Sequence, residues 1–332
     1  MSTEPAPRPL DAPDAGQAAG EARQSAVAVR LSDRVELAVF RIALGFFAAL
    51  PLRVALRVGA CLGELFYLFD ARDRRVAMFN LGMAFPDKSE AEHRRILRAS
   101  CRNLGRTAAE FCHLRKLDAG DVSEYVSFAD RNAWEQAIAR AAQTGAVILT
   151  AHFGNWELLA YVHGLLGHPV TLVHRPMRNV LFDQAITRIR AASGTRAIRK
   201  RAAAKEALRT LHQHGLVAIP ADQNQVHSFG VFVDFFGVPA CTTPGPARLA
   251  MLTGAPVIPV FLAREGEGPR HHVELLPDVE MISTGDREAD IRTNTQRCTA
   301  VIEEMIRRFP EQWIWFHKRW KTRPPGEPKL YT

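Results

Sequence analysis

A histidine and a glutamate stand five residues apart in the segment AVILTAHFGNWELLA, Ala146–Ala160. His152 is a candidate general base, because a neutral imidazole takes up a proton near neutral pH. Glu157 is its candidate partner, since a carboxylate that accepts one imidazole N–H fixes the tautomer and stabilises the imidazolium. The chain has no G-x-S-x-G elbow, Walker A loop or G-x-G-x-x-G segment. We therefore expect a base that activates a hydroxyl or a water directly.

The pair can meet only if the chain bends between its two members. Residues five apart lie about 16 Å apart on a strand and are turned by about 140° on a helix. Gly154 and Asn155 supply the bend, because glycine is conformationally free and asparagine is a strong helix N-cap. Two roles stay open for Asn155, namely capping the helix and binding substrate as an oxyanion donor. A histidine with a purely structural role also remains an alternative.

The sequence predicts neither a metal site nor a cofactor. His163, His168 and His174 show no ligand-like spacing with a carboxylate. The cysteines are odd in number and scattered, without C-x-x-C spacing, so we expect reduced, packed thiols on the cytoplasmic side of a membrane. They are Cys61, Cys101, Cys112, Cys241 and Cys298.

Strands alternate with helices after Val126, which predicts an α/β fold with a sheet flanked by helices on both faces. In such a sheet, functional groups gather where strands end. The expected strands are 147–150, 170–173, 216–219, 257–262 and 272–276, and residues 220–245 are expected to form a long loop. The expected helices are 156–166, 179–192, 202–212, 246–252 and 290–308, preceded by a helical stretch within residues 80–114.

The N-terminal part of the chain divides into two segments ahead of the catalytic domain expected at residues 71–332. Residues 1–30 are rich in Pro, Ala, Gly and acidic residues and carry no secretory signal pattern, so we expect a disordered tail. Residues 31–70 are mostly apolar, but the longest uncharged run, 42–52, is shorter than the roughly 20 residues that span a bilayer. We expect a membrane-anchoring helical segment, inserted or interfacial. A buried helical hairpin is the alternative.

A net charge of +8 predicts an acidic partner, for which anionic lipid, nucleic acid and acidic protein are candidates. The segment WIWFHKRWKTRPP, 313–325, interleaves aromatic and basic residues, which suits a lipid headgroup layer or single-stranded nucleic acid. A second basic stretch is either a docking surface or a solvated helix face. It comprises Arg196, Arg199, Lys200, Arg201, Lys205 and Arg209.

Several segments together resemble one enzyme family. HFGNWE is similar to the H-x-x-x-x-[DE] box of the lysophospholipid-type acyltransferases, in the form found in bacterial lipid A biosynthesis acyltransferases. The family's other blocks are resembled by NLGMAFPDKSEAE, HRPMRNVLFDQAITRIRAASG, the segment 221–264 and WIWFHKRWKTRPPGEP. The resemblance covers residues 31–328. It implies a glycerolphosphate-acyltransferase-like α/β fold with a mixed sheet and N-terminal membrane-associated helices.

The family also implies a chemistry. An acyl chain passes from an acyl carrier protein thioester to a hydroxyl of a phosphorylated glucosamine disaccharide lipid, at the cytoplasmic face of the inner membrane, without a cofactor. By this resemblance His152 and Glu157 are the catalytic pair. Arg175 is expected to grip a lipid phosphate, with an exposed salt bridge as the alternative. Asp222 is a candidate acceptor-binding residue, although the sequence departs there from the glutamate motif of the phospholipid acyltransferases, and a turn-forming role is the alternative.

Three other functions remain open at this point. A different glycolipid, such as a phosphatidylinositol mannoside, is one alternative acceptor. Water is another, which would make the protein a thioesterase. The third is a non-catalytic basic protein that binds membranes or nucleic acid. This alternative leaves the HFGNWE segment unexplained, so we expect no nucleic-acid partner.

Overall fold

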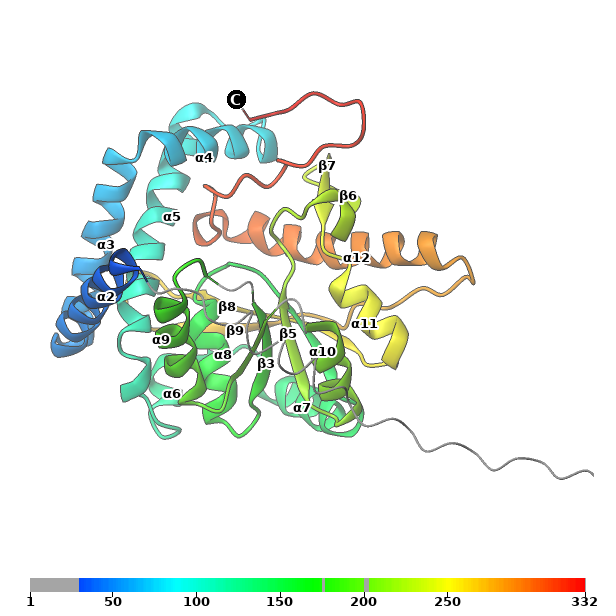
Figure 1. The fold of residues 1–332 in the computed structure, drawn as a ribbon, viewed down its shortest axis with the longest axis horizontal. Helices are drawn as coiled ribbons and strands as arrows, with labels where there is room; N and C mark the ends of the chain where they lie inside the picture. Colours follow the sequence, from blue (N-terminus) through cyan, green and yellow to red (C-terminus); the bar gives the residue numbers. More distant parts are fainter. Residues whose placement is uncertain (1–29, 175–176, 200–202, 332) are drawn as a thin grey trace, which may run out of the picture.

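The computed structural model describes residues 30–174, 177–199 and 203–331. The expected disordered tail therefore lies outside the described residues, apart from Arg30. Within them the chain forms an α/β body built on one large sheet, with a layer of helices at each face (Figure 1). The predicted fold class, a mixed sheet flanked by helices, is confirmed.

The sheet has the strand order β1-β9-β8-β2-β5-β3-β4 in the described part of the chain. Strand β9 runs antiparallel to β8, whereas every other neighbouring pair is parallel. All residues of the central strands β2 and β8 are buried, as expected for strands covered on both faces. The strands are β1 (Val126–Phe128), β2 (Ala146–Thr150), β3 (Val170–His174), β4 (Arg196–Arg199), β5 (Leu216–Pro220), β8 (Val257–Arg264) and β9 (His271–Leu275).

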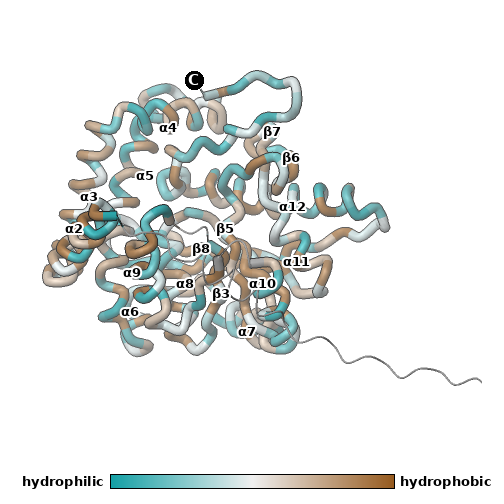
Figure 2. Tube along the Cα trace, viewed as in Figure 1, coloured by the Kyte–Doolittle hydropathy of each residue, from teal (hydrophilic) through white to brown (hydrophobic). Residues whose placement is uncertain are grey.

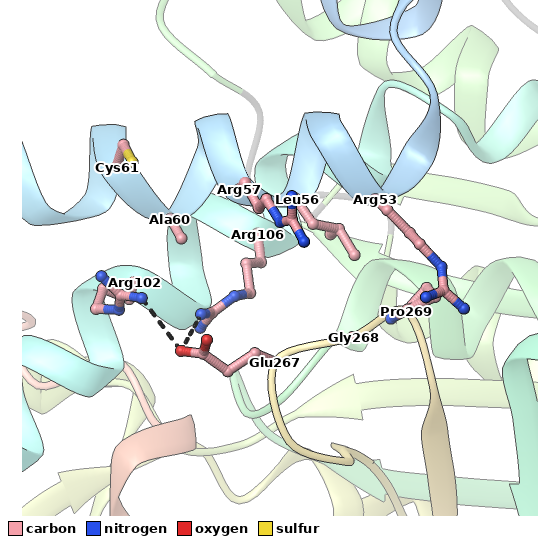
Figure 3. Close-up of a pocket in the computed structure, with 10 residues that line it drawn as sticks. All are labelled: Arg53, Leu56, Arg57, Ala60, Cys61, Arg102, Arg106, Glu267, Gly268 and Pro269. Atoms are coloured by element: carbon pink, nitrogen blue, oxygen red, sulfur yellow. Dashed lines mark hydrogen bonds and ion pairs between the residues drawn. The ribbon is translucent and has the colours of Figure 1, made fainter.

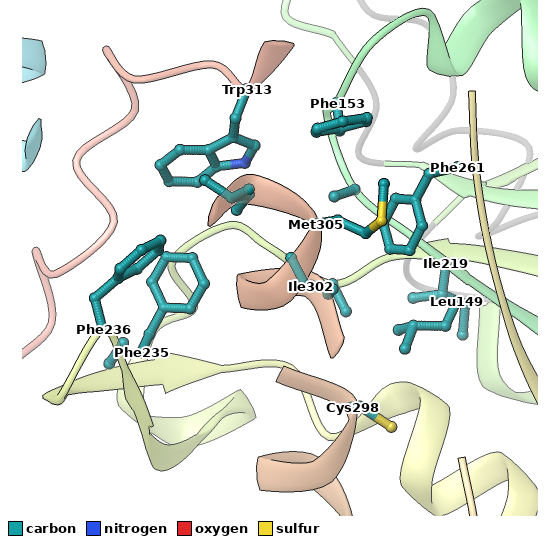
Figure 4. Close-up of a cluster of buried hydrophobic side chains, with 14 of the residues drawn as sticks. Leu149, Phe153, Ile219, Phe235, Phe236, Phe261, Cys298, Ile302, Met305 and Trp313 are labelled. Carbon is teal, nitrogen blue, oxygen red and sulfur yellow. The ribbon is translucent and has the colours of Figure 1, made fainter. Parts of the chain in front are cut away.

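Alternate residues of the central strands enter two separate cores. On β2, Val147 and Leu149 pack with α12 and the C-terminal tryptophans, whereas Ala146 and Ile148 pack with α7 and α8. Figure 4 shows the first core, where Leu149, Ile219 and Met305 meet Phe153 and Phe261. The helices are α2 (Leu31–Ala49), α3 (Leu52–Phe69), α4 (Ala71–Ala84), α5 (Glu90–Phe111), α6 (Val122–Tyr125), α7 (Arg131–Thr144), α8 (Trp156–Leu165), α9 (Val180–Ala191), α10 (Ala203–His212), α11 (Gly245–Thr253) and α12 (Arg287–Arg308).

The expected long loop after β5 contains a strand pair, which corrects the sequence prediction. Strands β6 (Val231–Phe235) and β7 (Val238–Thr242) form an antiparallel hairpin closed by Phe236 and Gly237. Phe235 and Phe236 turn into the core against α12 and Trp313, as Figure 4 shows. The apolar run VFVDFFGV thus forms a hairpin because its aromatic residues are buried by a distant helix.

Helix α3 packs unusually closely on α5 because both carry small residues at the crossing. A Cβ atom on Gly59 would lie 2.3 Å from the carbonyl oxygen of Gly105, and one on Gly63 would lie 2.1 Å from that of Cys101. Substitution at either glycine would therefore push the two helices apart. This contact holds α3 tightly against α5.

The predicted N-terminal apolar helices exist, as α2 and α3, but neither is long and apolar enough to cross a membrane, and the same holds for every helix among the residues described. The inserted form of the anchor is therefore not supported. Helix α2 packs one face on α9, where the rings of Phe40 and Phe182 lie 4.5 Å apart. Its opposite face is apolar and exposed, and so is one face of α3 (Figure 2). The exposed residues are Leu31, Val35, Val39, Ile42 and Phe46 on α2, and Val54, Leu62, Leu65, Leu68 and Phe69 on α3.

Candidate active site

His152 and Asp222 come together at the carboxyl edge of the sheet. Strands β2 and β5 are parallel neighbours, with Thr150 paired to Pro220 at their ends. Each strand is followed two residues later by a polar side chain, His152 after β2 and Asp222 after β5. The parallel register therefore places the two side chains next to each other at the edge where α/β proteins bind their ligands.

The carboxylate of Asp222 holds His152 by two hydrogen bonds. The imidazole Nδ1 lies 2.9 Å from Oδ1, and the backbone N–H of His152 donates to Oδ2 at 3.1 Å. The indole Nε1 of Trp313 donates to the same Oδ2 at 2.8 Å. With Nδ1 as the donor to a carboxylate, Nε2 of the neutral ring is left as an acceptor. No hydrogen bond to Nε2 exists among the described residues, and the His152 side chain is 25 % exposed.

The electrostatics of the pair favour a charged Asp222 and a basic His152. Burial disfavours the charge of Asp222, yet the neighbouring imidazole and the hydrogen bonds from His152 and Trp313 lower its pKa to about 2. Burial also opposes protonation of His152, but the charge and hydrogen bond of Asp222, followed by the charge of Glu157, raise its pKa above 6.5. His152 is thus a stronger base than an isolated histidine.

Glu157 does not hydrogen-bond to the imidazole, which corrects the expected His152–Glu157 contact. Its carboxylate accepts two hydrogen bonds from Arg190, Nε to Oε2 at 2.8 Å and Nη2 to Oε1 at 2.6 Å. Oε1 also accepts from the indole of Trp156, whose ring packs edge-on against His152. The helix turn places Glu157 close enough to influence the pKa of His152, but a guanidinium from α9 engages both of its oxygens.

Asn155 is a helix cap, and its expected role in substrate binding is not supported. Its Oδ1 accepts from the backbone N–H of Leu158 at 3.0 Å, and its Nδ2 donates to Glu110 at 2.5 Å. The residue is 1 % exposed. Gly154 supplies the predicted bend, with φ of 57° and with space for no Cβ, because that atom would lie 1.8 Å from the carbonyl oxygen of Leu262.

A buried ion pair between Arg264 and Glu110 supports the bend at Gly154 through hydrogen bonds to neighbouring residues. Arg264 at the end of β8 donates from Nη1 and Nη2 to the two oxygens of Glu110 on α5, at 2.7 and 2.6 Å. The backbone N–H of Arg264 donates to Gln312 Oε1 at 2.7 Å, and Gly154 donates to the Gln312 carbonyl at 2.8 Å. Burial opposes the charge of Glu110, but His271 and Arg264 lower its pKa to about 2. The network connects α5, β8 and the segment after α12 to the loop that carries His152.

Replacing Arg264 by alanine is expected to destabilise the protein by about 3–5 kcal/mol, because it leaves the buried carboxylate of Glu110 without its guanidinium partner. Urea unfolding followed by circular dichroism measures this loss. Arg131→Ala is the matched control, since its ion pair with Glu135 is exposed and is worth about 0–1 kcal/mol. Equal losses for the two variants would contradict the bracing role of Arg264.

The C-terminal aromatic segment is core, so the expected headgroup or nucleic-acid surface is wrong. Trp313, Trp315 and Trp320 are 0–1 % exposed, and Arg319 is fully buried, where it donates to the backbone of Cys241 and to Thr242. The segment supports the site through the bond from Trp313 to Asp222. No local pattern in the segment distinguishes these tryptophans from surface aromatics.

The remaining predicted site residues have different outcomes. Arg175 lies outside the described residues, so its expected phosphate contact stays a prediction. Asp222 is placed in the site as the partner of His152, whereas the sequence suggested acceptor binding or a turn. Arg190 and Trp156 were not identified from the sequence as residues of the site. The signal for Asp222 was present in the sequence, because it follows its strand by the same two residues as His152.

A partly exposed histidine that a carboxylate orients, at the carboxyl edge of a sheet, is an arrangement that can serve as a general base. The chain belongs to the bacterial lipid A biosynthesis acyltransferase family, whose sequence profile matches residues 31–322. It is therefore an acyltransferase, as the resemblance predicted.

Three enterobacterial proteins illustrate its relatives. The chain is 28% identical over 289 residues to the lipid A biosynthesis palmitoleoyltransferase of Escherichia coli K12, covering 87% of this chain and 92% of that protein. It is 29% identical to the lauroyltransferase of the same strain, over 85% of this chain and 90% of the relative. Its identity to the myristoyltransferase of that strain is 25%, over 78% of each chain.

Proposed function

We propose that the protein transfers a fatty acyl chain from an acyl carrier protein thioester to a hydroxyl of a lipid A precursor, with His152 as general base and Asp222 as the carboxylate that positions it. The observation that carries this proposal is the bond between His152 Nδ1 and Asp222, which leaves Nε2 as an acceptor in a partly exposed ring. Family membership supports the acyl transfer and the acceptor class.

The proposed reaction needs one base and no covalent acyl-enzyme. His152 Nε2 removes the proton of the acceptor hydroxyl while the hydroxyl oxygen attacks the thioester carbonyl. The tetrahedral intermediate collapses to the ester, the carbon–sulfur bond breaks, and the imidazolium returns the proton to the departing thiolate. The first-turn backbone N–H groups of Trp156 and Glu157 are candidate donors to the oxyanion, because the start of a helix leaves such groups unpaired.

Glu157 keeps a part in this mechanism, but an indirect one. Its negative charge raises the pKa of His152, and its hydrogen bond from Trp156 orients the ring that packs on the imidazole. Arg190 in turn holds Glu157. The role of Arg175 in gripping a lipid phosphate remains part of the proposal, on the strength of the family resemblance alone.

The apolar faces of α2 and α3 support a membrane-associated enzyme at the cytoplasmic face of the inner membrane. Exposed apolar faces on a folded protein mark interaction sites. Leu31 is 77% exposed and Phe69 is 80% exposed. An amphipathic helix that lies in the headgroup layer fits these faces, because it buries apolar residues without spanning the bilayer.

An acidic carrier protein as acyl donor is consistent with the basic stretch near β4 and α10. Arg196, Lys205 and Arg209 are exposed there, and Arg209 also pairs with Glu206 at 2.8 Å. Lys200 and Arg201 lie outside the described residues. Electrostatic steering between a basic patch and an acidic partner raises the association rate.

The proposed function is tested by the lipids of cells with and without the gene. Mass spectrometry of membrane lipids from the deletion strain is expected to show a lipid A species that lacks one acyl chain, and the gene should restore it whereas its His152→Ala form should not. The purified enzyme with acyl carrier protein thioester should produce acylated lipid. Free fatty acid as the main product would indicate a thioesterase instead. A change in a glycolipid other than lipid A in the deletion strain would show that the acceptor is that glycolipid and not a lipid A precursor.

A further inference from the structure

A basic pocket lies between α3, α5 and the segment that joins β8 to β9, with a cavity volume of about 470 Å³. Four arginines and one carboxylate line it: Arg53, Arg57, Arg102, Arg106 and Glu267 (Figure 3). None of these residues takes part in the His152 site. We propose that this pocket binds the phosphate headgroup of an anionic bilayer lipid and so fixes the orientation of the enzyme on the membrane.

The charges of the pocket are unbalanced. Arg102 and Arg106 share Glu267, at 3.1 and 2.5 Å, and Figure 3 shows their guanidiniums meeting at that carboxylate. Arg53 and Arg57 extend from α3 on the side of residues 267–269, and no carboxylate of the described residues lies within ion-pair distance of either. Arg102 also lies 3.6 Å from Glu64, so two carboxylates, Glu267 and Glu64, face the four guanidiniums, and Arg53 and Arg57 carry the excess positive charge.

A phosphate ester is the anion that this lining suits best. A guanidinium offers planar, paired N–H donors that match phosphate oxygens in bidentate fashion, and it is less strongly hydrated than an ammonium group. The lining contains arginines and no lysine. Arg106 is largely buried, with a side chain only 7 % exposed, so the pocket has a fixed cationic wall in addition to the exposed Arg53 and Arg57.

The position of the pocket on α3 points to a lipid as the source of the phosphate. Successive helix residues are about 100° apart, so Arg53 and Arg57 form one stripe, and Val54 and Leu65 lie on the neighbouring stripe. Both apolar residues are exposed and belong to the apolar face of α3. A lipid whose phosphate enters the pocket would therefore have its acyl chains beside this apolar face, as for arginines that border an interfacial helix.

This inference rests on the proposed membrane face of α2 and α3, and vesicle binding separates the two. The full-length protein is sedimented with vesicles of phosphatidylcholine alone or with about one third phosphatidylglycerol. We expect binding to both, with a clear preference for phosphatidylglycerol. Failure to bind either would overturn the membrane face and this inference together. Equal binding to both would overturn only this inference. Neither outcome depends on acyl transfer, which is assayed separately.

Matched variants test whether the preference for phosphatidylglycerol arises from the pocket. Arg53→Gln/Arg57→Gln should reduce the affinity for phosphatidylglycerol vesicles roughly 10–30-fold, since each interfacial arginine contributes about fivefold. The control Arg131→Gln/Arg140→Gln removes the same charge from exposed positions on α7, distant from α3 in Figure 1, and should change little. Glu267→Gln should strengthen binding roughly fivefold. Equal losses for the two double variants, or weaker binding by Glu267→Gln, would contradict the proposal.

Binding of inorganic phosphate tests whether the pocket takes the phosphate of a lipid or that of a soluble compound. Titration of phosphate into the protein in a non-ionic detergent, at constant ionic strength, should show no saturable binding below about 10 mM. Saturable binding at lower concentration that is lost in Arg53→Gln/Arg57→Gln would make the pocket a site for a soluble phosphate compound and overturn the lipid proposal.

Discussion

Replacement of His152 by alanine should lower kcat by roughly 10²–10⁴-fold, because the acceptor hydroxyl loses the base that removes its proton. The partly exposed ring makes one hydrogen bond to Asp222, so the variant should still fold. Acyl transfer from carrier protein thioester to the lipid acceptor, at saturating concentrations of both, measures the effect. Circular dichroism checks the fold.

His212→Ala is the matched control for this variant. His212 ends α10 and precedes β5, so it lies at the amino edge of the sheet, opposite the edge that carries His152, and it is exposed. Its removal should leave kcat within a factor of about two, as for most surface substitutions. Turnover retained by the His152 variant would remove the proposed mechanism, whereas an equal loss in both variants would point to misfolding.

Replacement of Asp222 by asparagine should lower kcat/KM by roughly 10²–10⁴-fold and also move its pH profile. The first effect follows because an amide can stabilise the wrong imidazole tautomer and carries no charge to stabilise the imidazolium. The second has a definite sign. Asp222 raises the pKa of His152, and a general base works only when unprotonated, so the wild-type rate falls as pH drops through a value above 6.5. Without the carboxylate that acid limb should move to lower pH.

Glu157→Gln is the comparison that separates the two carboxylates. Both raise the pKa of His152, but only Asp222 hydrogen-bonds to the ring. The glutamine variant should therefore shift the acid limb to lower pH while reducing the maximal rate less than Asp222→Asn does. If Glu157→Gln lost more of the rate than Asp222→Asn, Glu157 would be the carboxylate that acts on His152, as the sequence suggested. That result would contradict the positioning role of Asp222.

The local features of the site were predictable from the sequence. A buried strand that ends at Thr150, a glycine that bends the chain at 154 and an asparagine that starts α8 are all encoded within ten residues. The alternation of strands and helices likewise predicted the sheet and the edge at which His152 lies. The hairpin β6–β7 was missed, because its aromatic residues are explained only by the distant helix α12 that covers them.

The sequence by itself determined the strand–bend–helix unit and the place of His152 in it, because these depend on residues that are neighbours along the chain, and it determined the family through several short segments. Only the tertiary structure decided which groups surround that imidazole. Asp222 is 70 residues away from His152, and Trp313 is a further 91 residues from Asp222. Parallel strand register and packing against the sheet bring them together. The same holds for the arginine pocket, where two helices that cross at glycines bring Arg53 and Arg57 of α3 beside Arg102 and Arg106 of α5.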